Sequence, residues 1–289
     1  MVTDVKLSRR AAVLGIASAP TLWGCHGKSR TSADQVRQAH TSTPRSDATV
    51  LLRIEGRDTR DGADATLRRI FPHPQLRDFD PFVLLDDFDV RVPAGFPEHP
   101  HRGFEAFTYM IEGAFHHKDN LGNDSKISAG GTQRFNSGSG ARHSEMPATD
   151  GANRGLQLWV NLQRDKKKMT PEYQGVAADA MPVGENGLYR VHEVVGPTSP
   201  VALHTEVDYL DITLLRAGEW GTTIPTGRNT LLYAIAGDLR VGDVDVPRGV
   251  AVTVSGGDLL VRGPEGGRFA YLSGRPHGEP ILHRGPFVD

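Results

Sequence analysis

Cysteine is nearly absent from this sequence, because its 289 residues include a single one, Cys25. One thiol cannot close an internal disulfide, so packing of apolar side chains must stabilise the fold. The sequence also lacks an excess of either charge, since 33 Lys and Arg stand against 35 Asp and Glu. No broad basic stripe is available to neutralise a phosphate backbone, so we do not expect nucleic acid as a partner.

The N-terminal apolar run, residues 11–19, is too short to span a bilayer as a permanent helix. It follows Ser8-Arg9-Arg10 and precedes Pro20, an arrangement that resembles a cleavable twin-arginine export signal. The alternative is that residues 11–24 form a short helix of the folded domain. We expect an exported protein, located in the periplasm or at the cell surface.

A possible membrane anchor follows the signal. Leu22-Trp23-Gly24-Cys25 resembles a lipoprotein cleavage box, in which the cysteine carries the lipid. Residues 26–47 contain almost no large apolar side chain and cannot bury enough surface to offset chain entropy. We therefore interpret residues 1–47 as a signal peptide and flexible tether, with membrane contact only through a lipid at Cys25.

The rest of the sequence favours an all-β fold with few short helices. Its 33 Gly and 19 Pro, with Leu, Val and Ile in short runs, are typical of many tight turns between short strands. Two series of alternating strands indicate an N-terminal barrel at 48–165 and a C-terminal barrel at 188–289. Residues 166–187, beginning with three lysines, are expected to be a solvated connector.

Two pairs of polar residues in the N-terminal half have the same spacing. His99 and His101 lie two residues apart, and so do His143 and Glu145. In an extended strand this spacing places both side chains on one face. If the two strands face each other across a small barrel, four donor atoms converge on one metal ion. The alternative is a satisfied polar group on the barrel rim.

Other polar residues of this region are weaker candidates. Five of the 12 histidines fall between residues 99 and 143, which favours ligation. His116 and His117 are adjacent, so at most one can face the barrel interior, and we expect solvent or pocket positions for them. Glu105 could rotate toward the metal, but a salt bridge or turn role is the simpler interpretation.

The two halves share a fragment that predicts duplication. Residues 109–113 and 233–237 match at an offset of 124 positions. The same offset places Thr223, Pro225 and Asn229 opposite His99, His101 and Glu105, in that order. Aligning the Gly-rich turns of the two halves places Val261 opposite His143 and Gly263 opposite Glu145. These residues are poor metal ligands as a set, so the C-terminal barrel is expected to be metal-free.

Several segments resemble the pirin family of bicupins, in the family's order. They are Asp80-Pro81-Phe82-Val83-Leu84-Leu85-Asp86-Asp87-Phe88, His99-Pro100-His101-Arg102-Gly103-Phe104-Glu105, Asp119-Asn120-Leu121-Gly122-Asn123, His143-Ser144-Glu145 and Leu158-Trp159-Val160-Asn161-Leu162. The resemblance covers residues 50–289 and implies two tandem cupin barrels. It also implies one metal in the N-terminal barrel, with His99, His101, His143 and Glu145 as ligands.

The ligand set and the resemblance together lead to a functional hypothesis. Three imidazoles and one carboxylate suit one divalent ion, Fe(II) first, with Ni, Mn, Cu or Zn also possible, and leave open positions on a six-coordinate iron. Some family members resemble quercetin 2,3-dioxygenases, which predicts a hydroxyaromatic or flavonol-like substrate and dioxygen, with Glu145 as general base. The alternatives are a non-catalytic metal- or redox-sensing binding protein and a bare structural bicupin. We expect a monomer.

Overall fold

The structure is a computed structural model that describes residues 47–289. The export signal and Cys25 lie outside the described residues. Within them, strands joined by turns make up most of the chain, and the helical part is one 3-10 turn, η1 (Ala178–Ala180). The expected all-β fold is confirmed. No helix in residues 47–289 is long and apolar enough to cross a bilayer.

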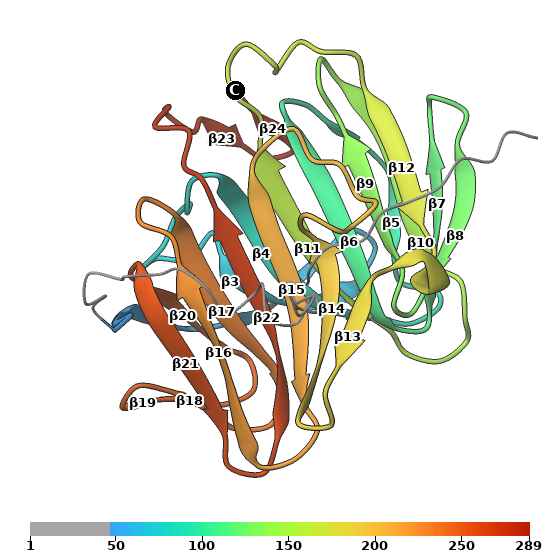
Figure 1. Ribbon diagram of the computed structural model, residues 1–289. Coiled ribbons are helices and arrows are strands. Elements are labelled where there is room, and N and C mark those ends of the chain that lie inside the picture. Colours follow the sequence, from blue (N-terminus) through green and yellow to red (C-terminus); the bar gives the residue numbers. More distant parts are fainter. Residues whose placement is uncertain (1–46) are drawn as a thin grey trace, which may run out of the picture. The chain divides into compact units, whose positions relative to one another are not determined.

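The first half of the chain builds a seven-stranded and a four-stranded antiparallel sheet (Figure 1). The seven-stranded sheet has the order β12 (Glu172–Val176), β9 (Thr132–Asn136), β6 (Phe104–Glu112), β11 (Asn153–Asn161), β4 (Phe82–Val90), β3 (Ala65–Phe71) and β2 (Arg57–Asp61). The four-stranded sheet has the order β5 (Phe96–His101), β10 (Ala141–Pro147), β7 (Ala114–Asp119) and β8 (Asp124–Ser128).

The second half repeats this arrangement strand for strand. Its seven-stranded sheet has the order β1 (Val50–Glu55), β20 (Val250–Val254), β17 (Asn229–Ala236), β22 (Gly267–Gly274), β15 (Val207–Leu214), β14 (Tyr189–Val195) and β13 (Val183–Glu185). Its four-stranded sheet has the order β16 (Gly218–Ile224), β21 (Gly257–Gly263), β18 (Leu239–Val241) and β19 (Val244–Val246). The predicted duplication is visible in this common order. A small hairpin follows, β23 (His283–Arg284) with β24 (Phe287–Val288).

The halves exchange their outermost strands. β1 pairs with β20 and so completes the second large sheet, whereas β12 pairs with β9 and completes the first. The strand pairing therefore departs from the expected boundaries 48–165, 166–187 and 188–289, because β1 belongs to the C-terminal sheet and the connector supplies β12 and β13. The alternating pattern of a short strand does not show which sheet the strand joins. That depends on which strand it forms hydrogen bonds with in the folded chain.

The two large sheets pack against each other through a shared apolar cluster that contains buried residues of both. Two tyrosine–aspartate hydrogen bonds connect the halves within it. Tyr109 Oη donates to Asp211 Oδ2 at 2.8 Å, and Tyr233 Oη donates to Asp87 Oδ2 at 2.7 Å. Both tyrosines and both aspartates are related by the offset of 124 positions. The contact between the halves is therefore reciprocal, as in a symmetric dimer.

The interiors of the two barrels differ in polarity. The second barrel is filled by an apolar cluster that includes Trp220, Val261 and Phe269. In the first barrel the apolar residues form two separate clusters, and polar side chains such as Gln133 and Glu145 are buried in the same half. A duplicated scaffold thus has one filled interior and one polar interior.

The three lysines of the connector do not share one environment. Lys166 Nζ donates to the carbonyl of His204 at 3.0 Å, and Lys167 Nζ donates to three oxygen atoms, whereas Lys168 is exposed. The expectation of a solvated lysine run is therefore wrong for the first two.

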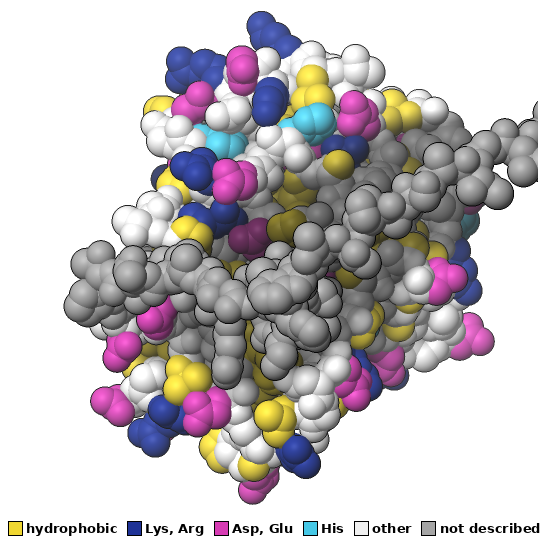
Figure 2. Space-filling model, in the orientation of Figure 1, with side chains coloured by type: hydrophobic (Ala, Val, Ile, Leu, Met, Phe, Trp, Pro, Cys, Tyr) yellow, Lys and Arg dark blue, Asp and Glu magenta, His cyan; other side chains and the backbone are white. Residues whose placement is uncertain are grey.

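Elsewhere on the face shown in Figure 2, acidic and basic side chains of the described residues are interspersed.

We predict that Tyr109→Phe and Tyr233→Phe each lower the free energy of unfolding by about 2 kcal/mol, because each removes a buried hydrogen bond to a charged acceptor. Urea denaturation of the purified protein measures this. Tyr189→Phe, at a half-buried tyrosine of β14, is the control and should cost less than about 0.5 kcal/mol. Equal losses in all three variants would show that the reciprocal bonds have no special role.

Candidate metal centre

Two paired strands position the three histidines. β10 runs antiparallel to β5, with His143 directly opposite His99 and Ala141 opposite His101. His101 and His143 are buried, with 3% and 1% of their surface exposed, and His99 is partly buried. The spacing of two residues along β5 brings both of its imidazoles to His143, as predicted. The two strands do not face each other across the barrel as expected, however, because β5 and β10 are hydrogen-bonded neighbours in one sheet.

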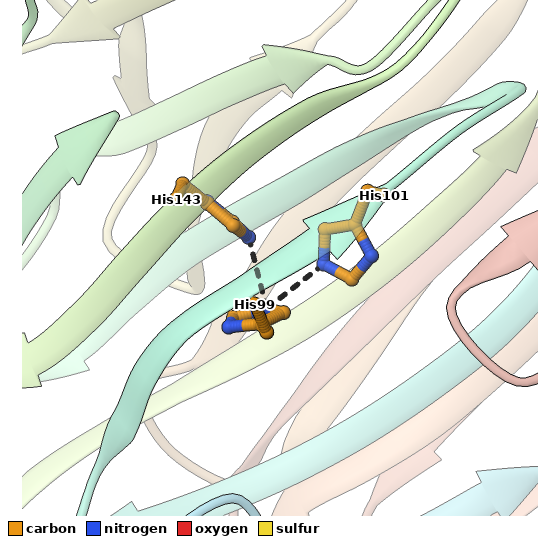
Figure 3. Close-up of side chains that lie close together, drawn as sticks. All are labelled: His99, His101 and His143. Atoms are coloured by element: carbon orange, nitrogen blue, oxygen red, sulfur yellow. Dashed lines mark hydrogen bonds between the residues drawn. The ribbon is translucent and has the colours of Figure 1, made fainter. Parts of the chain in front are cut away.

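The imidazole nitrogens converge, as Figure 3 shows. The Nε2 atom of His99 lies 2.9 Å from Nε2 of His101 and 3.1 Å from Nε2 of His143. Within the described residues, these three side chains form a group whose ligand atoms all lie within 4.8 Å of one another. The described geometry therefore includes a compact three-nitrogen donor set.

The other ring nitrogens indicate which tautomers are present. Nδ1 of His99 lies 2.8 Å from the carbonyl oxygen of Pro97, and Nδ1 of His101 lies 3.4 Å from that of Pro286. A carbonyl oxygen only accepts, so both Nδ1 atoms donate, and the neutral rings turn unprotonated Nε2 atoms toward each other. Nitrogen lone pairs facing at about 3 Å repel unless a cation lies between them, so the donor set fits a metal ion.

Burial keeps the rings of His101 and His143 neutral. Desolvation, with a smaller contribution from His99, lowers the pKa of His101 to about 3. Desolvation, followed by the neighbouring imidazoles, also lowers the pKa of His143 well below its usual range. Neutral imidazole is the form that ligates metals, so the surroundings favour ligation at neutral pH without prior loss of a proton.

Glu145 is buried near the histidines, but it is not a member of the group of three. The register of β10 against β5 shifts between His143 and Glu145. The carboxylate is engaged with side chains of three other strands: Thr108 Oγ1 at 2.6 Å, Gln133 Nε2 at 2.5 Å and Gln157 Nε2 at 2.8 Å. These donors hold Glu145 in place, and its role as a fourth ligand stays a prediction.

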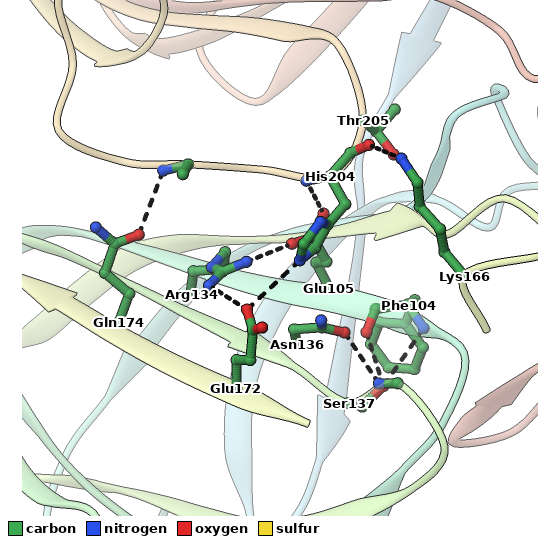
Figure 4. A network of polar contacts seen from close by, with 12 residues as sticks. Phe104, Glu105, Arg134, Asn136, Ser137, Lys166, Glu172, Gln174, His204 and Thr205 are labelled. Atoms are coloured by element: carbon green, nitrogen blue, oxygen red, sulfur yellow. Dashed lines mark hydrogen bonds and ion pairs between the residues drawn. The ribbon is translucent and has the colours of Figure 1, made fainter. Parts of the chain in front are cut away.

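Glu105 has the salt-bridge role that the sequence favoured. It is fully buried, its Oε1 accepts from Arg134 Nη1 at 3.0 Å, and its Oε2 accepts from the backbone N–H of His204 at 2.9 Å. Figure 4 shows this network, in which Arg134 also contacts Glu172. Burial raises the pKa of Glu105, against the lowering effect of Arg134. Its carboxylate stabilises the contact between the first sheet and the loop before β15.

The adjacent histidines alternate as expected, but the expected solvent or pocket position is wrong for His117, which is buried and does not line the cavity. His116 is half-exposed and pairs with Asp124, whereas His117 is fully buried and its Nε2 lies 3.1 Å from Asp119 Oδ2. The His117 ring stacks on Tyr173, with centroids 4.2 Å apart, and lies 5.3 Å from the His143 ring. His117 therefore packs beside His143 without joining the group of three.

A cavity of about 610 Å³ opens onto His99 and His101. Its walls include His99, His101 and Glu145 together with aromatic side chains, among them Phe96 and Trp159. The cavity therefore combines apolar and aromatic walls with polar and charged side chains, as a site for a polar small molecule does.

The second barrel carries no comparable group among the described residues. Val261 pairs with Trp220 there, in the way that His143 pairs with His99 in the first barrel. The residue at the position of His99 is thus Trp220 rather than the expected Thr223, because the turn between β16 and β17 is longer than the corresponding turn after β5. The side chains at these two positions, Trp220 and Val261, are not metal ligands.

We predict that the protein binds one divalent ion per chain and that His143→Ala lowers its affinity for Co(II) by at least about 100-fold, because one of three converging donors is lost. Elemental analysis after dialysis against Co(II) gives the stoichiometry, and calorimetric titration gives the affinity. His116→Ala is the matched control in the same barrel and should bind normally. Equal binding by both variants would place the metal elsewhere.

Comparison with known proteins identifies the family. The profile described as Pirin matches residues 64–160, and that described as the Pirin C-terminal cupin domain matches residues 209–289. A pirin-like protein of Solanum lycopersicum is 38% identical over 83% of this chain and 86% of its own length. A Pseudomonas aeruginosa protein that carries the name of a candidate quercetin 2,3-dioxygenase is also 38% identical, over 81% of this chain and 88% of its own.

Among solved structures, a quercetin 2,3-dioxygenase from Acinetobacter baumannii is 26% identical and covers 83% of each chain, with a TM-score of 0.76. The two cupin barrels, the histidine group in the first barrel and the matches along both halves lead to one conclusion: this chain belongs to the pirin family.

Proposed function

We propose that this protein is a metal-dependent dioxygenase that acts on a flavonol-like (quercetin-type) or enediol substrate. The observation that carries the proposal is the group of three imidazoles whose Nε2 atoms converge, with His101 and His143 buried and with His99 and His101 at the wall of a cavity. The names of the Pseudomonas aeruginosa and Acinetobacter baumannii relatives support the reaction class.

The residues that would hold the metal are His99, His101 and His143, with Glu145 as the proposed fourth donor. Three imidazoles and a carboxylate suit Fe(II) best, and also accept Ni, Mn, Cu or Zn. When bound, such an ion supplies Lewis acidity toward substrate oxygens and, in the case of iron, redox chemistry toward dioxygen.

The cavity walls bind and orient the substrate. Trp159 stacks on Phe104, with ring centroids 4.1 Å apart, and its ring lies 4.9 Å from that of His101. This packing fixes an aromatic surface beside the histidines, against which a planar hydroxyaromatic ring can lie. Apolar walls also exclude water from the reacting atoms.

Glu145 is placed to act on a proton. Its carboxylate lines the cavity, and donors on β6, β9 and β11 fix its orientation. Thr108 Oγ1 lies near both the Glu145 carboxylate and the side-chain amide oxygen of Gln157, Oε1. Its hydroxyl has one proton, which it donates to the carboxylate because that is the stronger acceptor. A substrate hydroxyl near the histidines would transfer its proton to this held carboxylate, which is general-base catalysis.

The same cavity offers donors for further substrate hydroxyls. Arg69 is held by Asp86, with Nε to Oδ1 at 2.9 Å and Nη2 to Oδ2 at 2.7 Å, and both residues line the cavity. Burial raises the pKa of Asp86 to about 6 despite the neighbouring guanidinium. The pairing fixes the Arg69 side chain at the cavity wall, where its remaining N–H groups can bind an oxygen atom of a polyhydroxylated ring.

We predict that the Fe(II)-loaded protein consumes dioxygen with at least one compound from a panel of flavonols and enediols, and that Glu145→Gln lowers kcat by about 100-fold or more, because the general base is lost. An oxygen electrode measures turnover, and elemental analysis of each variant shows whether the metal remains. Glu112→Gln, at an exposed glutamate of β6, should behave as the unaltered protein.

Two outcomes would contradict this function. Metal bound at one ion per chain with no oxygen uptake across the panel would favour the non-catalytic, redox-sensing alternative. Glu145→Gln with full kcat would remove Glu145 from the catalytic role.

A further inference from the structure

The hairpin 282–289 follows the second barrel in sequence but lies against the first. Its strands β23 and β24 pair with each other, and two backbone hydrogen bonds between Leu282 and Asp289 extend the pairing at the open end of the hairpin. Phe287 bridges Arg102, immediately after the ligand strand β5. In Figure 1 this red hairpin stands beside strands of the first barrel. A segment from one half is thus attached to the metal-binding segment of the other.

Backbone contacts bring the two segments unusually close. The N–H of Val288 donates to the carbonyl of Arg102 at 2.9 Å, and the N–H of Arg102 lies 3.4 Å from the carbonyl of Pro286. The Val288 side chain is fully buried in an apolar cluster with Phe104. A Cβ atom at Gly103 would lie 1.9 Å from the Val288 carbonyl, and φ there is +86°, so this approach requires glycine.

Two cationic side chains hold the hairpin in place. The Arg102 guanidinium makes three hydrogen bonds of 2.9–3.1 Å to the Asp289 carboxylate and lies over the Phe287 ring, 4.7 Å from its centroid. Lys167 Nζ donates to the carbonyl of Val288 at 2.9 Å and to that of Gly103 at 3.0 Å. One exposed ion pair stabilises little, but these contacts converge on one short segment.

The hairpin also reaches the candidate metal centre. The carbonyl of Pro286 accepts from Nδ1 of His101, a contact between residues 185 positions apart in the sequence. His283 and Pro286 line the cavity, and the His283 ring lies 5.7 Å from that of Trp159. The segment therefore touches both a proposed ligand and a wall of the substrate cavity.

We propose that the hairpin 282–289 is a positioning element of the metal centre: by accepting the Nδ1 proton of His101 it directs the Nε2 lone pair toward the ion, and it forms one wall of the cavity. The proposal rests on the metal site proposed above. Outer partners of ligating histidines set ring orientation, and their loss typically lowers metal affinity about 10- to 100-fold. Arg102, Lys167 and Asp289 act on the metal through the hairpin and do not touch it.

The test compares Co(II) binding by the full chain, by Asp289→Ala, and by a truncation lacking residues 286–289. Calorimetric titration gives the affinity, and the visible absorption spectrum of Co(II) reports ligand geometry. We expect the truncation to weaken binding about 10-fold or more and to change the spectrum, since an outer partner of His101 is removed. Asp289→Ala should have a smaller effect in the same direction, and Asp289→Glu should restore affinity and spectrum.

Arg284→Ala, at an exposed position of the same hairpin, is the matched control and should bind as the full chain does. Thermal melting of the metal-free proteins shows which variants are folded, and Asp289→Ala provides the comparison if the truncation is not. A folded Asp289→Ala or truncated protein with unchanged affinity and spectrum would overturn the positioning role alone. Failure of the full chain itself to bind Co(II) would instead overturn the metal site.

Discussion

Three imidazole nitrogens meet in the first barrel, two of them on buried side chains, and this contact is unfavourable unless a cation accepts their lone pairs. The other features of the first barrel follow from that constraint. Backbone carbonyls of Pro97 and Pro286 accept the protons of the outward-facing nitrogens. Burial keeps His101 and His143 neutral, so the ring charge does not oppose an incoming ion.

The two halves show how one scaffold can serve two purposes. Both have the same strand order, and a reciprocal pair of tyrosine–aspartate bonds joins them. Trp220 and Val261 occupy in the second barrel the paired positions that His99 and His143 occupy in the first. Large apolar side chains fill the interior of the second barrel and contribute to stability. The first barrel has a polar interior and a cavity instead.

Much of the fold and of the centre could be predicted from the sequence. The spacing of two residues on β5 brought His99 and His101 together, because alternation along a strand is a local property. The alternation of His116 and His117, and the salt bridge of Glu105, follow from the same rule and from burial. The loss of ligands in the second half was also predictable, although insertions in its turns moved the matching position by a few residues.

Other features depend on long-range contacts that leave no local pattern. The lysines of the connector look solvated in sequence, yet Lys167 contacts backbone oxygens from residues 103 and 288. The hydrogen bonds that hold Glu145 come from three different strands, so its distance from the histidine group could not be read from the spacing of residues 143 and 145. The contacts of the hairpin 282–289 could not be predicted either, since His101, which it contacts, lies 185 positions before Pro286.

The exchange of outer strands affects the order in which the two halves can fold during synthesis. β1 precedes every other strand, but Val50 pairs with Val254, so β1 must wait for about 200 further residues before its partner exists. During that interval its backbone donors and acceptors are open to other strands, and such distant pairing slows folding. The first large sheet, by contrast, has all its strands once residue 176 has been synthesised. The ligand-bearing barrel can therefore assemble early in translation, while completion of the other half depends on nearly the whole polypeptide.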